Sequence, residues 1–361
     1  MSAALLIVAR SLHIAASILL GGIFTFEVVA LGRIRAPAGD DLHEVERRLL
    51  LVAGWTLVAA LLSALLWFWL EVASMSGLSL ANAISGTAWR TVLFKTGFGR
   101  VWQLRLGLIA VATVLAGVRL IHDHRQSALK LSLWLVGFVL LVSLAWISHA
   151  AAASTQPLGL LGDALHLCAA GGWIGGLLPL TIFLAAAQVS FSLGAHAAHV
   201  LRRFSALNLC CVSILVISGL SNSWLLVGSV RALFTTRYGA LLIFKLALFA
   251  ILLGFGVRNR FVIKTKLLSA PIRSDLFSQL RRNVIYELCL GVAVVAIVGC
   301  LGVTPPVHLG SIPTKTPTST SERGTRSGGR LLDHRRHLAS RVCSLDEGEA
   351  PEILQARPNH L

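Results

Sequence analysis

Eight stretches of the chain are apolar over about 20 residues, and most charged residues fall between them. The stretches cover residues 5–26, 49–70, 101–121, 129–149, 160–186, 204–228, 238–257 and 283–303. A transmembrane helix needs about 20 mostly apolar residues, and a segment in lipid must pair its own backbone hydrogen-bonding groups, which a single strand does not do. The pattern therefore predicts an all-α polytopic membrane protein with eight transmembrane helices.

The composition agrees with this fold class. Of the 361 residues, 55% are hydrophobic and 13% are charged, and this charged share is about half that of a soluble domain. The formal net charge of +16 does not indicate nucleic-acid binding, because the basic residues lie in short loops between apolar spans and form no continuous patch. We expect the lipid bilayer, and no nucleic acid, as a partner.

The distribution of basic residues predicts the orientation. The loops after the first, third, fifth and seventh spans hold sixteen Arg and Lys residues, whereas the opposite side, without the C-terminal tail, holds six. Loops rich in Arg and Lys stay in the cytoplasm. Both termini are therefore expected on the outer side of the membrane.

An internal repeat relates the two halves of the chain. Residues 93–108 (LFKTGFGRVWQLRLGL) align without gaps on residues 233–248 (LFTTRYGALLIFKLAL). Residues 12–22 (LHIAASILLGG) likewise resemble residues 165–176 (LHLCAAGGWIGG), with one residue fewer before the glycines. Self-similarity of this kind indicates a duplicated structural unit.

The repeat and the change in composition near the C-terminus predict three regions. Residues 1–150 and 155–303 form two four-helix units, and residues 307–361 form a polar, disordered tail because their composition cannot bury a core. Four is an even number, so both units run in the same direction, as in transporters built from parallel repeats. A ligand site is expected at the seam between the two units.

Ionisable side chains inside the spans are the first candidates for function, because they cost free energy in lipid. Counting along each span places His13, His149 and His166 at one level near the outer surface, with Asp163 one helical turn from His166. Imidazole nitrogens and carboxylate oxygens bind Cu(II) and Zn(II), so these four residues are predicted to form a metal site. The alternative for each histidine is a hydrogen bond between packed helices, and Asp163 either binds the metal or orients His166.

Two glutamates near the inner face are weaker candidates. Glu27 and Glu287 either form an exit site for a cation or pair with nearby arginines such as Arg282.

Four further residues are candidates for gating or support. Trp173 follows His166 on roughly the same helix face and either closes the site or packs in the core. Asn222 is either a polar ligand or a hydrogen-bonding contact between helices. Arg105 and Lys245, which are equivalent in the repeat, either gate cations or extend their charges to the membrane surface.

Several stretches resemble the copper-resistance D (CopD) family of bacterial inner-membrane proteins. They are DALHLCAAGGWIGGLLPL, the preceding ISHAAA, RFSALNLCCVSILVISGLSNSWLLVGSVRALFTTRYGALLIFKLALF and the closing RRNVIYELCLGVAVVAIVGCLGVTPP. The likeness covers spans four to eight best, spans one to three more loosely, and the tail not at all.

The resemblance implies a protein of the bacterial cytoplasmic membrane that takes part in copper homeostasis. In that membrane, the distribution of basic residues predicts both termini in the periplasm. It implies copper movement from periplasm to cytoplasm, often with a small periplasmic copper-binding partner of the CopC type. Family histidines correspond to His149 and His166, and a glutamate of the last helix corresponds to Glu287.

The residues themselves leave the oxidation state of copper open. The two methionines, Met1 and Met75, are both expected outside the membrane, so the site is rich in imidazole, which suits Cu(II), Cu(I) with few ligands, or zinc. No nucleotide-binding motif occurs, so transport is expected to be passive or driven by a gradient, and no enzyme activity is expected.

Two other functions stay open at this point. Paired histidines from different helices ligate haem, and His13 and His166, at matching repeat positions, make a haem-binding electron-transfer protein the main alternative. A copper-sensing or partner protein that does not transport copper is the other.

Overall fold

The computed structural model describes residues 2–32, 39–122, 127–147, 156–227, 229–263 and 274–304. The predicted tail at 307–361 and the candidate ligand His149 lie outside the described residues. The described residues all belong to one compact unit, Met1–Ile312, and they form helices and short connections without any strand.

Within the described ranges, eight helical stretches are long and apolar enough to cross a membrane. They are Ala4–Leu31, Asp40–Ser76, Gly97–Ile121, Ser127–Ile147, Pro157–Val189, Phe191–Trp224, Arg237–Phe261 and Leu276–Leu301. Each contains or overlaps one of the eight predicted spans. The prediction of an all-α polytopic protein is therefore confirmed.

The elements of each half follow in chain order. The first half contains α1 (Ser2–Thr25), η1 (Phe26–Leu31), α2 (Gly39–Ser76), α3 (Leu80–Ser85), α4 (Ala88–Lys95), α5 (Gly97–Ile121), α6 (Ser127–Val142) and η2 (Ser143–Ile147). The second half contains α7 (Gln156–Ala170), η4 (Gly171–Gly175), α8 (Gly176–Val189), α9 (Phe191–Val227), α10 (Val230–Thr235), α11 (Arg237–Arg258), η5 (Asn259–Ile263) and α13 (Ser274–Leu301).

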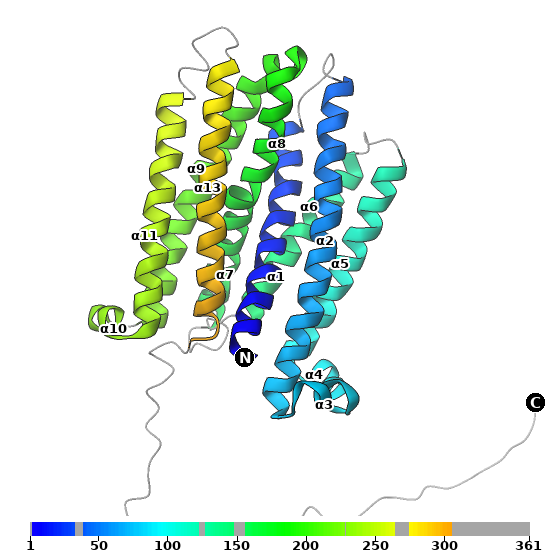
Figure 1. The fold of residues 1–361 in the computed structure, drawn as a ribbon, viewed down its shortest axis with the longest axis vertical. Coiled ribbons are helices and arrows are strands. Elements are labelled where there is room, and N and C mark those ends of the chain that lie inside the picture. The colour runs from blue at the N-terminus through cyan, green and yellow to red at the C-terminus, as the bar shows by residue number, and fades with distance from the viewer. Residues whose placement is uncertain are drawn as a thin grey trace, which may run out of the picture. The chain divides into compact units, whose positions relative to one another are not determined.

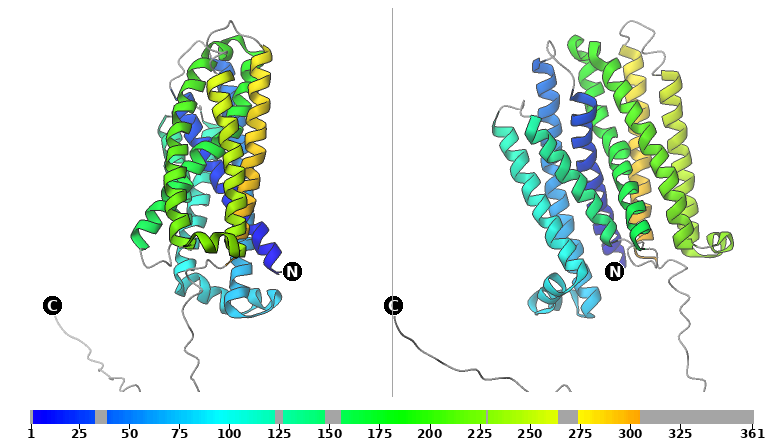
Figure 2. Two further views of the ribbon diagram at one scale, coloured as in Figure 1. Left: turned by 90° about the vertical axis from the view of Figure 1, so that its left-hand side faces the viewer. Right: turned by 180° about the vertical axis from the view of Figure 1, so that it is seen from behind.

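The long helices lie side by side, and α1 runs through the middle of the bundle (Figure 1). It packs against α2 and α6 of its own half and against η4, α8 and α13 of the other. The beginning of α1, the end of α13 and the short helices α3, α4 and α10 lie at one end of the bundle, which we call the N-terminal end (Figures 1 and 2). The sequence did not indicate these three short helices.

The two halves make a close backbone contact between glycines. A Cβ atom on Gly22 of α1 would collide with the backbone of Gly175 in η4, and one on Gly175 would collide with the carbonyl oxygen of Ile18. Only glycine permits backbones to approach this closely in a helix pair. These glycines therefore allow the two halves to pack tightly.

The span formed by α7, η4 and α8 is not a regular α-helix. Residues Gly171–Gly175 are π-helical, and Pro179 follows inside α8. Proline donates no backbone hydrogen bond, and π segments are frequent at functional positions of helices. The change of helical geometry occurs where α1 crosses this span.

One local structure recurs at equivalent positions of the predicted repeat. The Thr96 hydroxyl accepts a hydrogen bond from the Gly99 N–H at 3.0 Å and caps α5. The Thr236 hydroxyl accepts one from the Gly239 N–H at 3.0 Å and caps α11. Threonine at a helix N-cap satisfies one of the unpaired N–H groups of the first turn, so the same chemistry starts both helices.

Large apolar side chains cover the outside of the bundle. Trp55 is 76% exposed, Leu62 is 61% exposed and Ile217 is 67% exposed. A soluble monomer rarely exposes continuous apolar surface on this scale, whereas lipid-facing helices must be apolar. The surface therefore agrees with a protein that spans a bilayer.

Candidate functional site

His13 lies inside the first half and uses both of its ring nitrogens. Its Nδ1 is 3.0 Å from the carbonyl oxygen of Ala60 on α2, and its ring packs against Trp67 and Trp102, with centroids 5.8 Å and 5.6 Å away. Arg105 donates to Nε2, so Nε2 carries the lone pair and Nδ1 carries the proton. His13 is fully buried.

Arg105 reaches His13 from α5 and is itself buried. Its Nη2 is 2.7 Å from His13 Nε2 and 2.9 Å from Ser17 Oγ. Its Nη1 donates to the Leu140 carbonyl oxygen at 2.7 Å and to Ser143 Oγ at 2.5 Å. The side chain therefore points into the protein, and the alternative that it extends to the membrane surface is wrong. A metal ion at His13 Nε2 would have to displace this guanidinium.

His166 has a different environment on α7. Its Nδ1 lies 3.0 Å from Ser218 Oγ on α9, and Ser218 Oγ donates to the Ile214 carbonyl oxygen at 2.6 Å. The hydroxyl proton is thus used, so Ser218 accepts from Nδ1–H and the lone pair of His166 is on Nε2. No described residue hydrogen-bonds to this Nε2. His166 therefore presents a metal-binding nitrogen that His13 does not.

Asp163 precedes His166 by one helical turn and is tied to two neighbouring helices. Asn222 Nδ2 of α9 donates to Asp163 Oδ1 at 2.5 Å, which shows the interhelical contact that was one of the two predictions for Asn222. Lys245 of α11 also interacts electrostatically with Asp163 and with His166. The predicted outer residues Asp163, His166, Asn222 and Lys245 thus come together within the second half.

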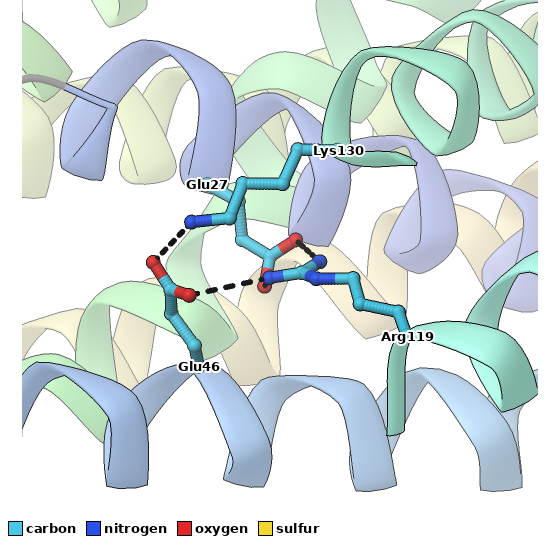
Figure 3. Close-up of polar contacts among 4 residues, drawn as sticks. All are labelled: Glu27, Glu46, Arg119 and Lys130. Carbon is cyan, nitrogen blue, oxygen red and sulfur yellow. Dashed lines mark hydrogen bonds and ion pairs between the residues drawn. The ribbon is translucent and has the colours of Figure 1, made fainter. Parts of the chain in front are cut away.

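At the opposite end of the bundle, the first half contains a buried ion-pair network (Figure 3). Arg119 Nη1 is 2.6 Å from Glu27 Oε2, and Arg119 Nη2 is 3.4 Å from Glu46 Oε2. Lys130 Nζ is 2.5 Å from Glu46 Oε1. Two carboxylates and two cations therefore balance one another. A buried charge needs such a partner to offset its loss of hydration.

This network was only partly visible in the sequence. Glu27 was expected either at a cation exit or beside an arginine such as Arg282, and it pairs with Arg119 instead. Arg119, Glu46 and Lys130 lie near the ends of apolar spans, where they count as loop charges. Their meeting depends on the packing of four helices, and no spacing along the chain indicates it.

Glu287 lies halfway along α13 and has no ion pair among the described residues. It is 3% exposed. Asn259 Nδ2 donates to Glu287 Oε1, and Asn283 Nδ2 donates to Asn259 Oδ1 at 2.9 Å. Its partners are thus neutral amides, and the alternative of a pair with Arg282 does not apply to it.

Glu287 lines a cavity of about 200 Å³ in the second half. The cavity lies between η4 and α8, the α9 helix, α11 with η5, and α13. Trp173 is part of its wall and is 2% exposed, and the Trp173 ring also packs on Phe249. Trp173 therefore contacts this cavity and the core; the structure does not place it against Asp163.

Two family models match the chain. One, described as "Copper resistance protein D-like, N-terminal domain", matches residues 1–160, and the other, described as "Copper resistance protein D", matches residues 198–301. The chain belongs to the copper resistance protein D family. No solved structure matches it.

Curated relatives of this copper resistance protein D family member carry related names. The chain is 29% identical over 262 residues to "Copper resistance protein D" of Pseudomonas syringae pv. tomato, which covers 68% of this chain and 83% of the relative. It is 32% identical over 206 residues to "Copper transport protein CutJ" of Bacillus subtilis (strain 168), covering 55% of this chain and 37% of the relative. "Inner membrane protein YebZ" of Escherichia coli (strain K12) is 26% identical over 249 residues, covering 66% of this chain and 82% of the relative.

In this family member, the predicted four-residue metal site is assembled only in part. Asp163 and His166 share one end of α7, His13 is enclosed by α2 and α5, and His149 lies outside the described residues. Among the described residues, no group of three or more His, Cys, Asp or Glu side chains is close enough to hold a metal ion. Both ring nitrogens of His13 are already hydrogen-bonded, so a haem iron at His13 would have to displace Arg105. The four-residue site stays a prediction.

Proposed function

We propose that the chain moves copper ions across the cytoplasmic membrane, from the periplasm to the cytoplasm, and that copper first binds at His166. The observation that carries this proposal is the state of the His166 ring. Its Nδ1 is fixed by Ser218, and its Nε2 keeps a lone pair that no described residue uses. A histidine held by a hydrogen bond at one nitrogen and open at the other is the usual arrangement of a metal ligand.

The neighbours of His166 support a cation as the ligand. Asp163 lies three residues before it on α7, and side chains at this spacing are neighbours on a helix surface. Asp163 supplies negative charge beside the imidazole. Asn222 donates to its Oδ1, and Lys245 interacts with it electrostatically. Nitrogen and oxygen donors of this kind suit Cu(II), and they also accept zinc.

The orientation supports entry from the periplasm. The helix α7, which carries His166, lies in the part of the bundle that includes the beginning of α1 and the end of α13 (Figure 1). The positive-inside rule assigns this end to the periplasm, so we propose periplasmic termini. A separate periplasmic copper-binding protein of the CopC type is then a suitable donor. We propose transport and no enzymatic reaction as the activity.

Copper accumulation in cells tests the proposal. Wild type, His166→Ala and His149→Ala are expressed in cells lacking their own copper uptake, and cellular copper is measured by mass spectrometry. We expect each substitution to lower accumulation at least fivefold while the protein stays in the membrane. His122→Ala is the matched control, because His122 is exposed at the end of α5 and its loss is expected to change nothing.

Two results would contradict the proposal. Wild-type accumulation in His166→Ala cells would remove His166 from the path. A haem absorption band in the purified protein that His166→Ala abolishes would favour electron transfer instead, since histidine is a common axial ligand of haem.

A further inference from the structure

Charged residues differ between the two halves at three pairs of equivalent positions. The alignment that pairs His13 with His166, extended towards the N-terminus, pairs Arg10 with Asp163. The ungapped alignment that pairs Arg105 with Lys245, extended by eleven residues towards the C-terminus, pairs Arg119 with Asn259. In two of these pairs, Arg10 with Asp163 and Arg119 with Asn259, the first half has a cation and the second half has an acidic or neutral residue.

In the first half, arginine side chains occupy the polar positions of the interior. Arg105 binds Nε2 of His13 at 2.7 Å, and Arg119 binds Glu27 at 2.6 Å. Both guanidinium groups are at most 1% exposed. Each therefore stands where a mobile cation would bind the same histidine or carboxylate.

In the second half, neither His166 nor Glu287 is hydrogen-bonded to an arginine among the described residues. Glu287 lies on α13 and is not the repeat counterpart of Glu27 in η1. Lys245 makes no hydrogen bond to His166 among the described residues, and it also interacts electrostatically with Asp163. Asn259 donates a hydrogen bond to Glu287 from a neutral amide, whereas an arginine at this position would carry a positive charge. His166 thus keeps a lone pair on Nε2, with Lys245 near it but not hydrogen-bonded to it. Glu287 keeps a buried carboxylate that accepts from a neutral amide.

The packing of the helices also differs between the two halves: it is tighter in the first half than in the second. In the first half α2 packs directly on α5. In the second half, α9 and α11 are the counterparts of α2 and α5, and the cavity beside Glu287 separates them. The lining on one side is Leu201, Ser205 and Asn208 of α9, and on the other it is Leu253 of α11 with Asn259. A volume of about 200 Å³ accommodates several water molecules or a hydrated ion.

The polar groups of this cavity suit a cation. Glu287 supplies a carboxylate, and Asn208 Oδ1 is buried without a hydrogen-bond partner. Arg260 is the other charged residue of the described lining, and its Nη1 is bound to the Ser205 carbonyl oxygen at 3.0 Å and to Ser205 Oγ at 2.7 Å. The side chains that α8 contributes, Leu177 and Leu180, are apolar.

We propose that the second half alone carries the cation path, from His166 to the cavity at Glu287, and that the first half is its closed copy. Arg105 and Arg119 are the residues that close it. Trp173 lies seven residues after His166, about 10 Å along the helix axis, and lines the cavity, so it stands between the two ends of the path. The path therefore differs from the seam between the halves, where Gly22 and Gly175 are in backbone contact. The identity of the cation as copper rests on the proposed function.

Placing the arginine of the first half into the second half tests the inference. Asn259→Arg puts a tethered cation beside Glu287, and we expect copper accumulation to fall at least tenfold. The melting temperature should stay within a few degrees of wild type, because the new cation pairs with a buried carboxylate. Asn259→Gln, which keeps a neutral amide, is the matched control and should retain most of the accumulation. Wild-type accumulation in a stably inserted Asn259→Arg protein would overturn the inference.

Chemical accessibility gives a second test that does not depend on copper transport. In a chain whose six cysteines are replaced by alanine, Val284→Cys lines the cavity and Ala116→Cys lies one turn from Arg119. A small cationic thiol reagent is applied to membrane vesicles. We expect it to modify Val284→Cys at least tenfold faster than Ala116→Cys, and equal rates would overturn the inference.

The two tests separate the two proposals. If wild-type cells accumulate no copper, the proposed function fails, while a reaction confined to Val284→Cys would still assign the cation path to the second half. If copper accumulates but both cysteines react equally, the proposed function stands and the inference fails.

Discussion

Arg105 donates a hydrogen bond to Nε2 of His13 across 2.7 Å, in a part of the first half that excludes solvent. This contact joins α5 to α1 and leaves neither nitrogen of His13 free. The equivalent pair in the second half, Lys245 and His166, shares no hydrogen bond among the described residues. The same two positions of the repeat therefore hold a closed contact in one half and an open histidine in the other.

Removal of Arg105 should destabilise the protein. Arg105→Leu leaves His13 Nε2 without its donor, and a buried unpaired group costs about 1–3 kcal/mol. We expect a lower melting temperature in detergent, followed by the fluorescence of the nine tryptophans. In the double variant with His13→Leu the loss should be smaller than the sum of the two single losses, because the two residues are in contact. Additive losses of melting temperature would show that the contact between Arg105 and His13 contributes nothing to stability.

The Glu27 and Arg119 pair should be a main source of stability in the first half. Arg119→Met leaves Glu27 as an unpaired buried charge, which typically costs about 3–5 kcal/mol. Glu44→Gln is the matched control, because Glu44 pairs with Arg48 at the exposed end of α2 and should have no measurable effect. Thermal unfolding of both variants measures the difference, and equal melting temperatures would contradict the assignment.

The contact between Gly22 and Gly175 should tolerate no side chain. In Gly175→Ala the new Cβ collides with the Ile18 carbonyl oxygen, and forcing apart a packed interface costs about 1–3 kcal/mol or more. We expect poor insertion or a clearly lower melting temperature. Gly107→Ala on α5, where a Cβ meets nothing within 4 Å, should behave as wild type. A normal Gly175→Ala protein would show that the halves are not packed through these glycines.

Ser218 should affect copper accumulation, whereas Ser63, whose Oγ lies 3.2 Å from Nδ1 of His13, should not. Ser218→Ala removes the acceptor at His166 Nδ1, and the loss of a residue that orients a metal ligand typically lowers affinity 10- to 100-fold. We expect accumulation at low external copper to fall, with partial recovery at higher concentration.

Ser63→Ala is the control for that experiment. His13 keeps its hydrogen bond to the Ala60 carbonyl oxygen in this variant, and the first half carries no cation in our proposal. An equal loss of accumulation in Ser63→Ala and Ser218→Ala would contradict a role for one half alone.

The eight spans, the all-α class and the family resemblance were readable from the sequence, because lipid imposes a run of about 20 apolar residues on every crossing. The repeat was readable locally, and the caps at Thr96 and Thr236 match at equivalent positions. The buried ion-pair network could not be predicted from the sequence, because Glu27, Glu46, Arg119 and Lys130 come from four different helices. In the sequence, a charged residue in a loop cannot be distinguished from one that is buried at the end of a helix. Only the packing of the helix ends distinguishes them.

The sequence by itself determined that this chain spans a membrane, that its two halves resemble each other, and that histidines and carboxylates lie within the spans. Those properties follow from the lipid bilayer as solvent. Each span must be apolar, and an ionisable group inside a span costs free energy that a partner or a function must offset. Only the tertiary structure decided which of these groups are already satisfied. His13 and Glu27 are bound by arginines from a neighbouring helix, while His166 and Glu287 are bound by neutral groups. The difference arises because a partner in a helix bundle is set by the rotation and depth of two packed helices, which distances along the chain do not record.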